Sequence, residues 1–144
     1  MVKPVGDERT PDGGEVAPQH PDREQLISFR VIDRSDAYIV VVGGAVDGLT
    51  APRLRDAIMR GFEARSGRPV VVDLSAVEFF GSAGLRTLWQ AAAEDADTPG
   101  FTPLRVVVDH NRPVIRPMEL VGLDKFLELY YDMPSAIEGE HERG

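Results

Sequence analysis

The residue whose type and place best suit chemistry is Ser82, in the connector Phe-Phe-Gly-Ser-Ala-Gly at residues 79–84. Apolar β-branched residues at 70–72 predict a buried strand before it, and apolar residues at 85, 88, 92 and 96 predict a helix after it. A serine at this junction is expected to be the N-cap, at the positive end of the helix dipole. Gly81 and Gly84 leave the nearby amides open to an anion. The hydroxyl is therefore a candidate for carrying or sensing a phosphate.

Three other chemistries fit the sequence less well. A hydrolase nucleophile on a strand-to-helix elbow needs glycine two positions before the serine, where Phe80 stands instead. A catalytic triad also needs a histidine, and His110, at the end of a different strand, is better explained as a loop residue. The glycine-rich connector at 43–48 lacks the G-x-G-x-x-G spacing of a dinucleotide loop, which favours a turn. Asp47, Asp73 and Asp109 are possible magnesium ligands, but such carboxylates more often cap helices and turns. The sequence thus indicates no metal and no cofactor.

Composition narrows the class of protein. The chain has 144 residues, of which 42% are hydrophobic, enough for one domain with a core. Its formal charge of −8 argues against direct binding of nucleic acid, which needs a basic face. There is no cysteine, no apolar run long enough to insert in a membrane and no signal-peptide pattern, so a cytoplasmic location is expected.

The elements that must position Ser82 follow from local patterns. Alternation at 26–32 and an apolar run at 38–42 predict a hairpin, and Thr50 as N-cap predicts a helix to about Arg65. Further strands are expected at 104–108 and 126–130, with helices between Asn111 and Gly122 and after Asp132. Single helices between strands predict right-handed parallel crossovers. The fold class is therefore α/β: a mixed, mostly parallel sheet with an antiparallel edge strand and about four helices, mainly on one face.

The domain organisation follows from where apolar residues are scarce. Residues 1–24 are rich in proline, glycine and charge, with three basic and six acidic side chains, and are predicted to be a disordered N-terminal tail. A partner-binding arm is the alternative for this segment. Residues 25–138 form the expected domain, and residues 139–144 are expected to fray.

Three motifs resemble the STAS domain, the fold of bacterial anti-sigma factor antagonists. They are D-L-S-x-V-x-F-F-G-S-A-G-L at 73–85, G-x-V-D-x-x-T-A-P-x-L at 44–54 and L-x-G-L-D-x-F at 120–126. They occur in the family's order, and the resemblance covers about residues 26–137, which makes it far more specific than any one motif.

The resemblance implies a non-enzymatic switch protein. In such proteins the serine at the position of Ser82 is phosphorylated by an anti-sigma factor, a kinase with a histidine-kinase-like ATPase fold, and a serine phosphatase resets it. The unphosphorylated antagonist binds the anti-sigma factor and so releases a sigma factor. The implied partner-binding residues are Asp47, Gly48, Leu49, Thr50, Phe80, Gly81, Ser82, Ala83, Gly84 and Arg86. Phe79 and Phe80 are expected to divide between the core and this surface, and the place of Trp89 is left open.

Gly81 departs from the family pattern, which usually has aspartate before the phosphorylated serine. A purely structural serine at position 82 is therefore one alternative. A module that senses a small anionic ligand, such as a nucleotide, is another, and an accessory subunit of a membrane lipid-transport complex is a third.

Overall fold

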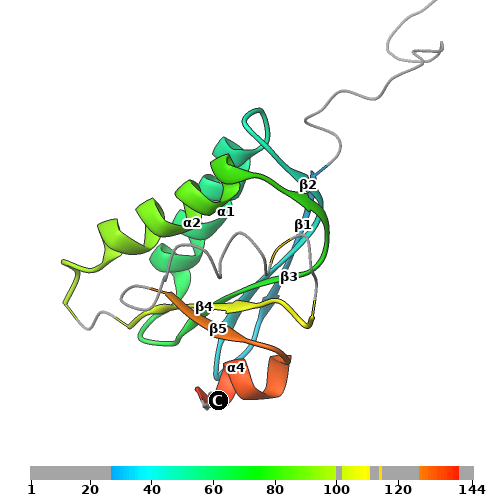
Figure 1. Cartoon of the computed structure of the whole chain (residues 1–144). Coiled ribbons are helices and arrows are strands. Elements are labelled where there is room, and N and C mark those ends of the chain that lie inside the picture. Colours follow the sequence, from blue (N-terminus) through cyan, green and yellow to red (C-terminus); the bar gives the residue numbers. More distant parts are fainter. Residues whose placement is uncertain (1–26, 100–101, 111–113, 115–126, 140–144) are drawn as a thin grey trace, which may run out of the picture.

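The fold is a five-stranded sheet with helices on both faces (Figure 1). The computed structural model describes residues 27–99, 102–110, 114 and 127–139. The strands are β1 (Ile27–Asp33), β2 (Tyr38–Val46), β3 (Val70–Phe80), β4 (Leu104–Val107) and β5 (Leu127–Tyr130). The helices are α1 (Ala51–Ala64), α2 (Ser82–Asp95) and α4 (Met133–Glu138).

The strand order is β1-β2-β3-β4-β5, with β1 antiparallel to β2 and every other neighbouring pair parallel. The predicted α/β class, with a mixed sheet and an antiparallel edge strand, is confirmed. The hairpin forms as expected, with Asp33 opposite Tyr38 and Ile27 opposite Gly44.

Two cores lie on opposite faces of this sheet. Helices α1 and α2 cover one face, where Leu54, Ile58 and Leu88 are fully buried. Helix α4 covers the other face, where it buries Ala136 (Figure 1). The Asp132 carboxylate caps α4, because its Oδ1 accepts a hydrogen bond of 2.7 Å from the Ser135 amide.

The structure describes three helices where about four were expected. The helix predicted between Asn111 and Gly122 lies outside the described residues, except for Val114, which is buried. The third sequence motif, at 120–126, and the predicted N-terminal tail also lie outside them.

Strand β3 is much longer than predicted and carries two extra residues relative to β2. Val41 pairs with Asp73 but Gly43 pairs with Ala76, and a second shift follows between Val77 and Phe79. Each shift is a β-bulge, which interrupts the strict alternation of a strand. As a result the buried residues of this stretch, Leu74, Val77 and Phe80, are spaced by three. The bulges therefore decide which side chains at the end of β3 face the solvent.

Candidate functional site

The predicted site residues come together at the carboxyl ends of β2 and β3. The amide of Gly81 donates a hydrogen bond of 3.0 Å to the carbonyl oxygen of Val46. This bond joins the β2–α1 loop, residues 47–50, to the start of α2, and Figure 1 shows the two segments at the same end of the molecule. The exposed residues at this end of the molecule form one set, which we call the Ser82 surface. It consists of Gly48, Leu49, Phe79, Ser82, Arg86 and Trp89.

The β2–α1 loop is held by its own polar side chains. Asp47 Oδ1 accepts hydrogen bonds from the amides of Leu49 (3.0 Å) and Thr50 (3.1 Å). The Thr50 hydroxyl accepts from the Asp47 amide and donates to the carbonyl of Ala45, both at 2.9 Å. Thr50 thus stands at the predicted N-cap position, but its side chain fixes the loop and does not cap α1. This arrangement turns Leu49 outward, leaving it 59% exposed.

Ser82 is the first residue of α2, and the prediction that it is the N-cap is wrong. Gly81 takes that position in an extended conformation (φ −90°, ψ −178°) because β3 continues through Phe80. The carbonyl of Gly81 accepts from the amides of Gly84 and Leu85, at 3.0 and 3.2 Å. Ser82 is exposed, and its hydroxyl makes no hydrogen bond to the residues that the structure describes. A reactive group from another molecule can therefore reach it.

Phe79 lies on the surface and Phe80 in the core. Phe79 is 53% exposed and Phe80 only 4%, because the second bulge of β3 turns Phe80 under the helices. The expectation that Phe80 itself contacts a partner is therefore corrected: Phe79 has the exposed position. The ring of Phe79 lies against Gly81, where a Cβ atom would come within 3.1 Å of its Cε2.

The predicted partner-binding residues divide by exposure. The exposed ones are Gly48, Leu49, Ser82 and Arg86, and those partly buried are Asp47, Gly81 and Ala83. The buried ones are Thr50, Phe80 and Gly84, which shape the surface from below. At Gly84 a Cβ atom would lie 2.7 Å from Cγ1 of Val46, so only glycine allows α2 this close to β2.

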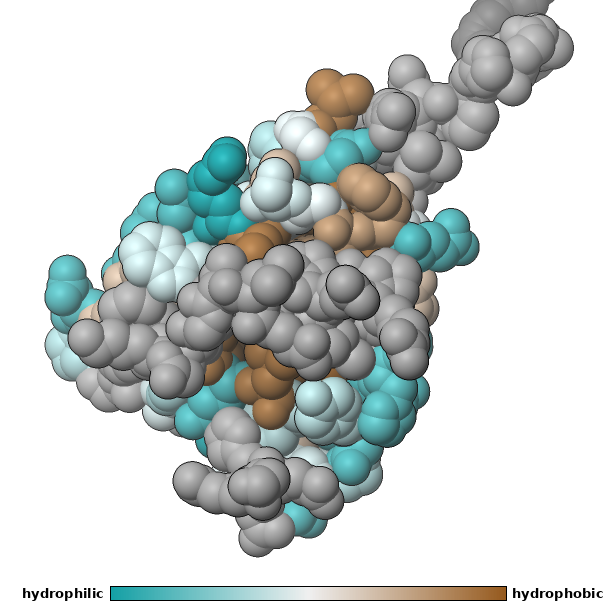
Figure 2. Space-filling model, in the orientation of Figure 1, coloured by the Kyte–Doolittle hydropathy of each residue, from teal (hydrophilic) through white to brown (hydrophobic). Residues whose placement is uncertain are grey.

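Trp89 belongs to the same surface, a role that the sequence left open. It is 44% exposed and lies seven residues after Ser82 on α2, with Arg86 between them, so the three share one helical stripe. Figure 2 shows brown and tan apolar surface at this end of the molecule among teal polar residues. The helical spacing from Ser82 is the signal that would have included Trp89.

Two residues named for the competing chemistries, Asp73 and His110, make other contacts. Asp73 Oδ1 accepts from the amide and the hydroxyl of Ser75, at 3.0 and 2.6 Å, and so holds a bulge of β3. His110 stacks on the ring of Tyr131, with centroids 5.2 Å apart. Within the described ranges no three histidine, aspartate or glutamate side chains gather as metal ligands would.

A family model confirms the resemblance that the motifs suggested. The STAS domain model matches residues 28–136, which include all of the Ser82 surface. The chain therefore belongs to the STAS domain family.

Two similar proteins carry names that describe a function. One is the anti-sigma-F factor antagonist RsfB of Mycobacterium tuberculosis, 34% identical over 113 residues that span 78% of this chain and 88% of the relative. The other is the crystal structure of an anti-sigma factor antagonist from Mycobacterium paratuberculosis. It is 36% identical, with a TM-score of 0.66, and the match covers 78% of this chain and 92% of that one.

A more distant structure shares the fold alone. It is the anti-sigma factor antagonist SpoIIAA in its unphosphorylated form, 15% identical with a TM-score of 0.57, covering 78% of this chain and 95% of that chain. In the part of this chain that the structure describes, no helix has both the length and the apolar composition to span a membrane.

Proposed function

We propose that this protein is an anti-sigma factor antagonist that binds an anti-sigma factor through the Ser82 surface and so releases a sigma factor. The relatives that carry this name are 34% and 36% identical and match over most of their own length. The protein acts by binding and not by catalysis, in the cytoplasm.

The observation that carries the proposal is the exposed hydroxyl of Ser82 among exposed apolar side chains. Leu49, Phe79 and Trp89 are each 44–59% exposed. Large apolar side chains that are exposed on one surface mark a site where a partner binds and covers them. Aromatic residues dominate the energetics of such interfaces. A small neutral hydroxyl at their edge leaves the surface free for docking.

Phosphorylation of Ser82 is the proposed control. A phosphate adds about −1.5 to −2 charges, which are costly to bury in an apolar interface. In the free protein the same charge lies at the first turn of α2, where the helix dipole stabilises it. Phosphate therefore favours the unbound state without any refolding. The proposed kinase is the anti-sigma factor itself, with a histidine-kinase-like ATPase fold, and a serine phosphatase removes the group.

Gly81 bears on the kinase step. The family's usual aspartate is absent, and the Phe79 ring occupies the space into which a side chain at position 81 would extend. We propose that the kinase contacts this ring where it would otherwise meet a carboxylate.

The test compares Ser82→Ala, Ser82→Glu and wild type for affinity to the cognate anti-sigma factor, by titration calorimetry. Ser82→Ala should bind as wild type does, and Ser82→Glu should bind at least about tenfold more weakly, the effect of burying a charge that lacks a partner. Ser35→Glu is the matched control, because Ser35 is exposed in the β1–β2 turn outside the Ser82 surface. Equal affinity of Ser82→Glu and Ser82→Ala would contradict the switch. Incubation with ATP and mass spectrometry should locate the phosphate on Ser82.

A further inference from the structure

Arg86 is the only charged residue of the Ser82 surface, and its place on α2 brings it close to Ser82. The two residues lie four positions apart in one helix, a spacing that puts side chains on the same face with Cβ atoms about 5–6 Å apart. Both are exposed, and within the described ranges neither side chain has a hydrogen bond or an ion pair. The Arg86 guanidinium is therefore within reach of a group attached to the Ser82 hydroxyl.

Other cations near the start of the helices are already engaged. Arg53, in the first turn of α1, lies over the ring of Phe29, 5.6 Å from its centroid. Arg55 donates a hydrogen bond of 2.7 Å to Glu94 at the far end of α2. A phosphate on Ser82 would thus meet Arg86 as the cation with no competing partner among the described residues.

The surroundings of Ser82 otherwise do little to balance a phosphate. The amides of Gly84 and Leu85 already donate to the carbonyl of Gly81, at 3.0 and 3.2 Å. The neighbouring segments carry the carboxylates of Asp47 and Glu78, and the whole chain has a formal charge of −8. These negative charges oppose a dianion, so a nearby cation matters more here than it would on a neutral surface.

Arginine is the side chain best suited to such a contact. Its planar guanidinium donates two parallel hydrogen bonds to phosphate oxygens, which the point charge of a lysine cannot match. An anion four residues before a cation is also the more favourable order, because the anion then lies toward the positive end of the helix dipole.

We propose that the phosphate of phosphorylated Ser82 forms an ion pair with Arg86 of the same chain. The inference rests on the proposed phosphorylation of Ser82. In the unphosphorylated protein Arg86 is available to a carboxylate of the anti-sigma factor, and in the phosphorylated protein the phosphate occupies it. Phosphorylation therefore removes the one cation of the Ser82 surface from the partner, in addition to placing a negative charge there.

The test uses the full chain with phosphoserine incorporated at position 82 during translation, so that no kinase is needed. The second pKa of the phosphate, ordinarily about 6, is measured by ³¹P NMR in the wild type and in variants of Arg86. The ion pair favours the dianion, so Arg86→Gln should raise this pKa by about 0.2–0.4, the size expected of a pair at this spacing. Arg86→Lys keeps the charge and should raise it less.

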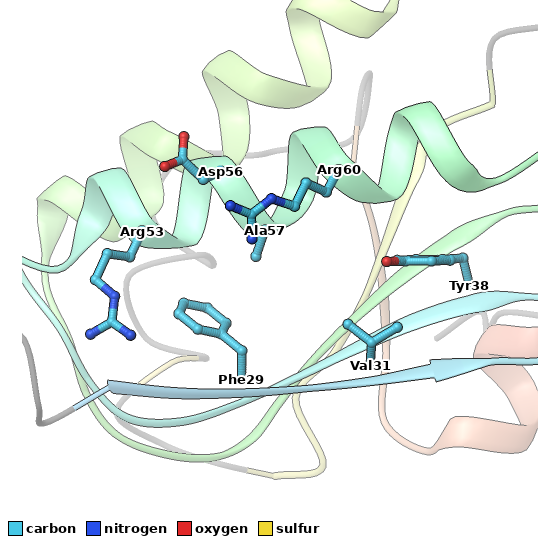
Figure 3. A pocket seen from close by; sticks show the side chains of 7 residues that line it. All are labelled: Phe29, Val31, Tyr38, Arg53, Asp56, Ala57 and Arg60. Carbon is cyan, nitrogen blue, oxygen red and sulfur yellow. The ribbon is translucent and has the colours of Figure 1, made fainter.

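Arg60→Gln is the matched control, because it removes the same charge from a different place. Arg60 is exposed in the second half of α1, where it lines a cleft between α1 and β1 (Figure 3), and it has no ion pair within the described residues. This variant should leave the phosphate pKa unchanged. In the wild type, phosphoserine at position 82 should also shift the ¹⁵Nε–H signal of Arg86 and not that of Arg60.

Three results would overturn the ion pair: an unchanged pKa in Arg86→Gln, an equal rise in Arg60→Gln, or a rise in Arg86→Lys as large as that in Arg86→Gln. Its failure is distinguishable from failure of the switch. Equal affinity of Ser82→Glu and Ser82→Ala for the anti-sigma factor would contradict the switch without changing the phosphate pKa, and an unchanged pKa would leave the affinities as they are.

Discussion

The two ends of α2 differ in the burial and pairing of their polar side chains. At the last turn, Asp95 forms two hydrogen bonds with Arg65 of α1's C-cap, at 2.7 and 3.0 Å, and both side chains are buried. At the first turn, Ser82 and Arg86 are exposed and pair with nothing in the described part of the chain. One end of the helix is fixed by buried charge, while the other leaves its side chains available.

This difference shows which end of α2 contributes more to the stability of the fold. The last turn also carries a second ion pair, in which Arg55 donates to Glu94 at 2.7 Å. The first turn is positioned by the Gly81–Val46 hydrogen bond, by the close approach of Gly84 to the Val46 side chain, and by Leu85, which packs against the core. The exposed side chains of Ser82 and Arg86 can therefore be exchanged at little cost to the fold, but the buried side chain of Asp95 cannot.

The largest effect is expected from Asp95→Ala. This change leaves the Arg65 guanidinium buried without its partner and should lower the free energy of unfolding by about 3–5 kcal/mol. Urea denaturation followed by circular dichroism measures it. The double variant Arg65→Met/Asp95→Leu should recover most of the loss, because an apolar pair removes the unpaired charge. An unchanged midpoint in Asp95→Ala would show that the fixed end does not depend on this pair.

The next effect concerns binding at the first-turn end. Phe79→Ser should weaken affinity for the anti-sigma factor by at least about 2 kcal/mol, roughly 30-fold, as for a central aromatic anchor. Its free energy of unfolding should stay within about 0.5 kcal/mol of wild type, because the ring is half exposed. Val31→Ser is the control, since Val31 is equally exposed on β1. Similar losses of affinity in both variants would contradict a localised docking surface.

Gly84→Ala tests the close packing of α2 on the Val46 and Phe80 side chains, which helps to place Ser82. The added methyl group would meet Val46 Cγ1 at 2.7 Å and Phe80 Cε1 at 2.8 Å. We expect a loss of about 1–3 kcal/mol from this overpacking, measured by urea denaturation. Gly48→Ala is the matched control, because a Cβ there meets nothing within 4 Å. Equal stability of the two variants would mean that α2 does not need this close approach.

The smallest effect belongs to the exposed pair of Glu94 with Arg55. The hydrogen bond from Arg55 lowers the pKa of Glu94 below its ordinary value of 4.5. Because the carboxyl binds its proton less readily in the folded state, the pair stabilises the fold above the unfolded pKa and this contribution is lost as pH falls.

Glu94→Gln should therefore differ slightly from wild type in thermal midpoint at pH 7, and the difference should vanish as the pH falls well below 4.5. High salt at pH 7 should reduce it in the same way, because exposed charges are screened. A difference that grows on acidification would contradict this assignment.

The sequence predicted the elements better than the side chains at their junctions. The hairpin, α1 and the capping of α4 by Asp132 follow from local residue patterns, so they were predicted closely. The orientation of Phe79 and Phe80 was not predictable, because the bulges that set it arise from the pairing of β3 with β2. For the same reason the sequence placed the N-cap at Ser82, one residue too late.

Surfaces formed between elements distant in sequence were also beyond prediction. The cleft between β1 and α1 is lined by Phe29, Val31 and Tyr38, among others. Its width depends on how far α1 stands from β1, a distance that no local pattern encodes. Trp89 was ambiguous for a different reason: its helical stripe was readable, but which stripe faces the sheet is decided by the packing of α1 beside α2.

The hydrogen bond between the Gly81 amide and the Val46 carbonyl has a consequence for the speed of recognition. It joins two segments 35 positions apart, so both are already in register before an anti-sigma factor arrives. Association then needs no loop ordering, and its rate should be limited by diffusion and orientation, in the ordinary range of about 10⁵–10⁷ M⁻¹s⁻¹. Phosphorylation of Ser82 would therefore act mainly on the dissociation rate of the complex.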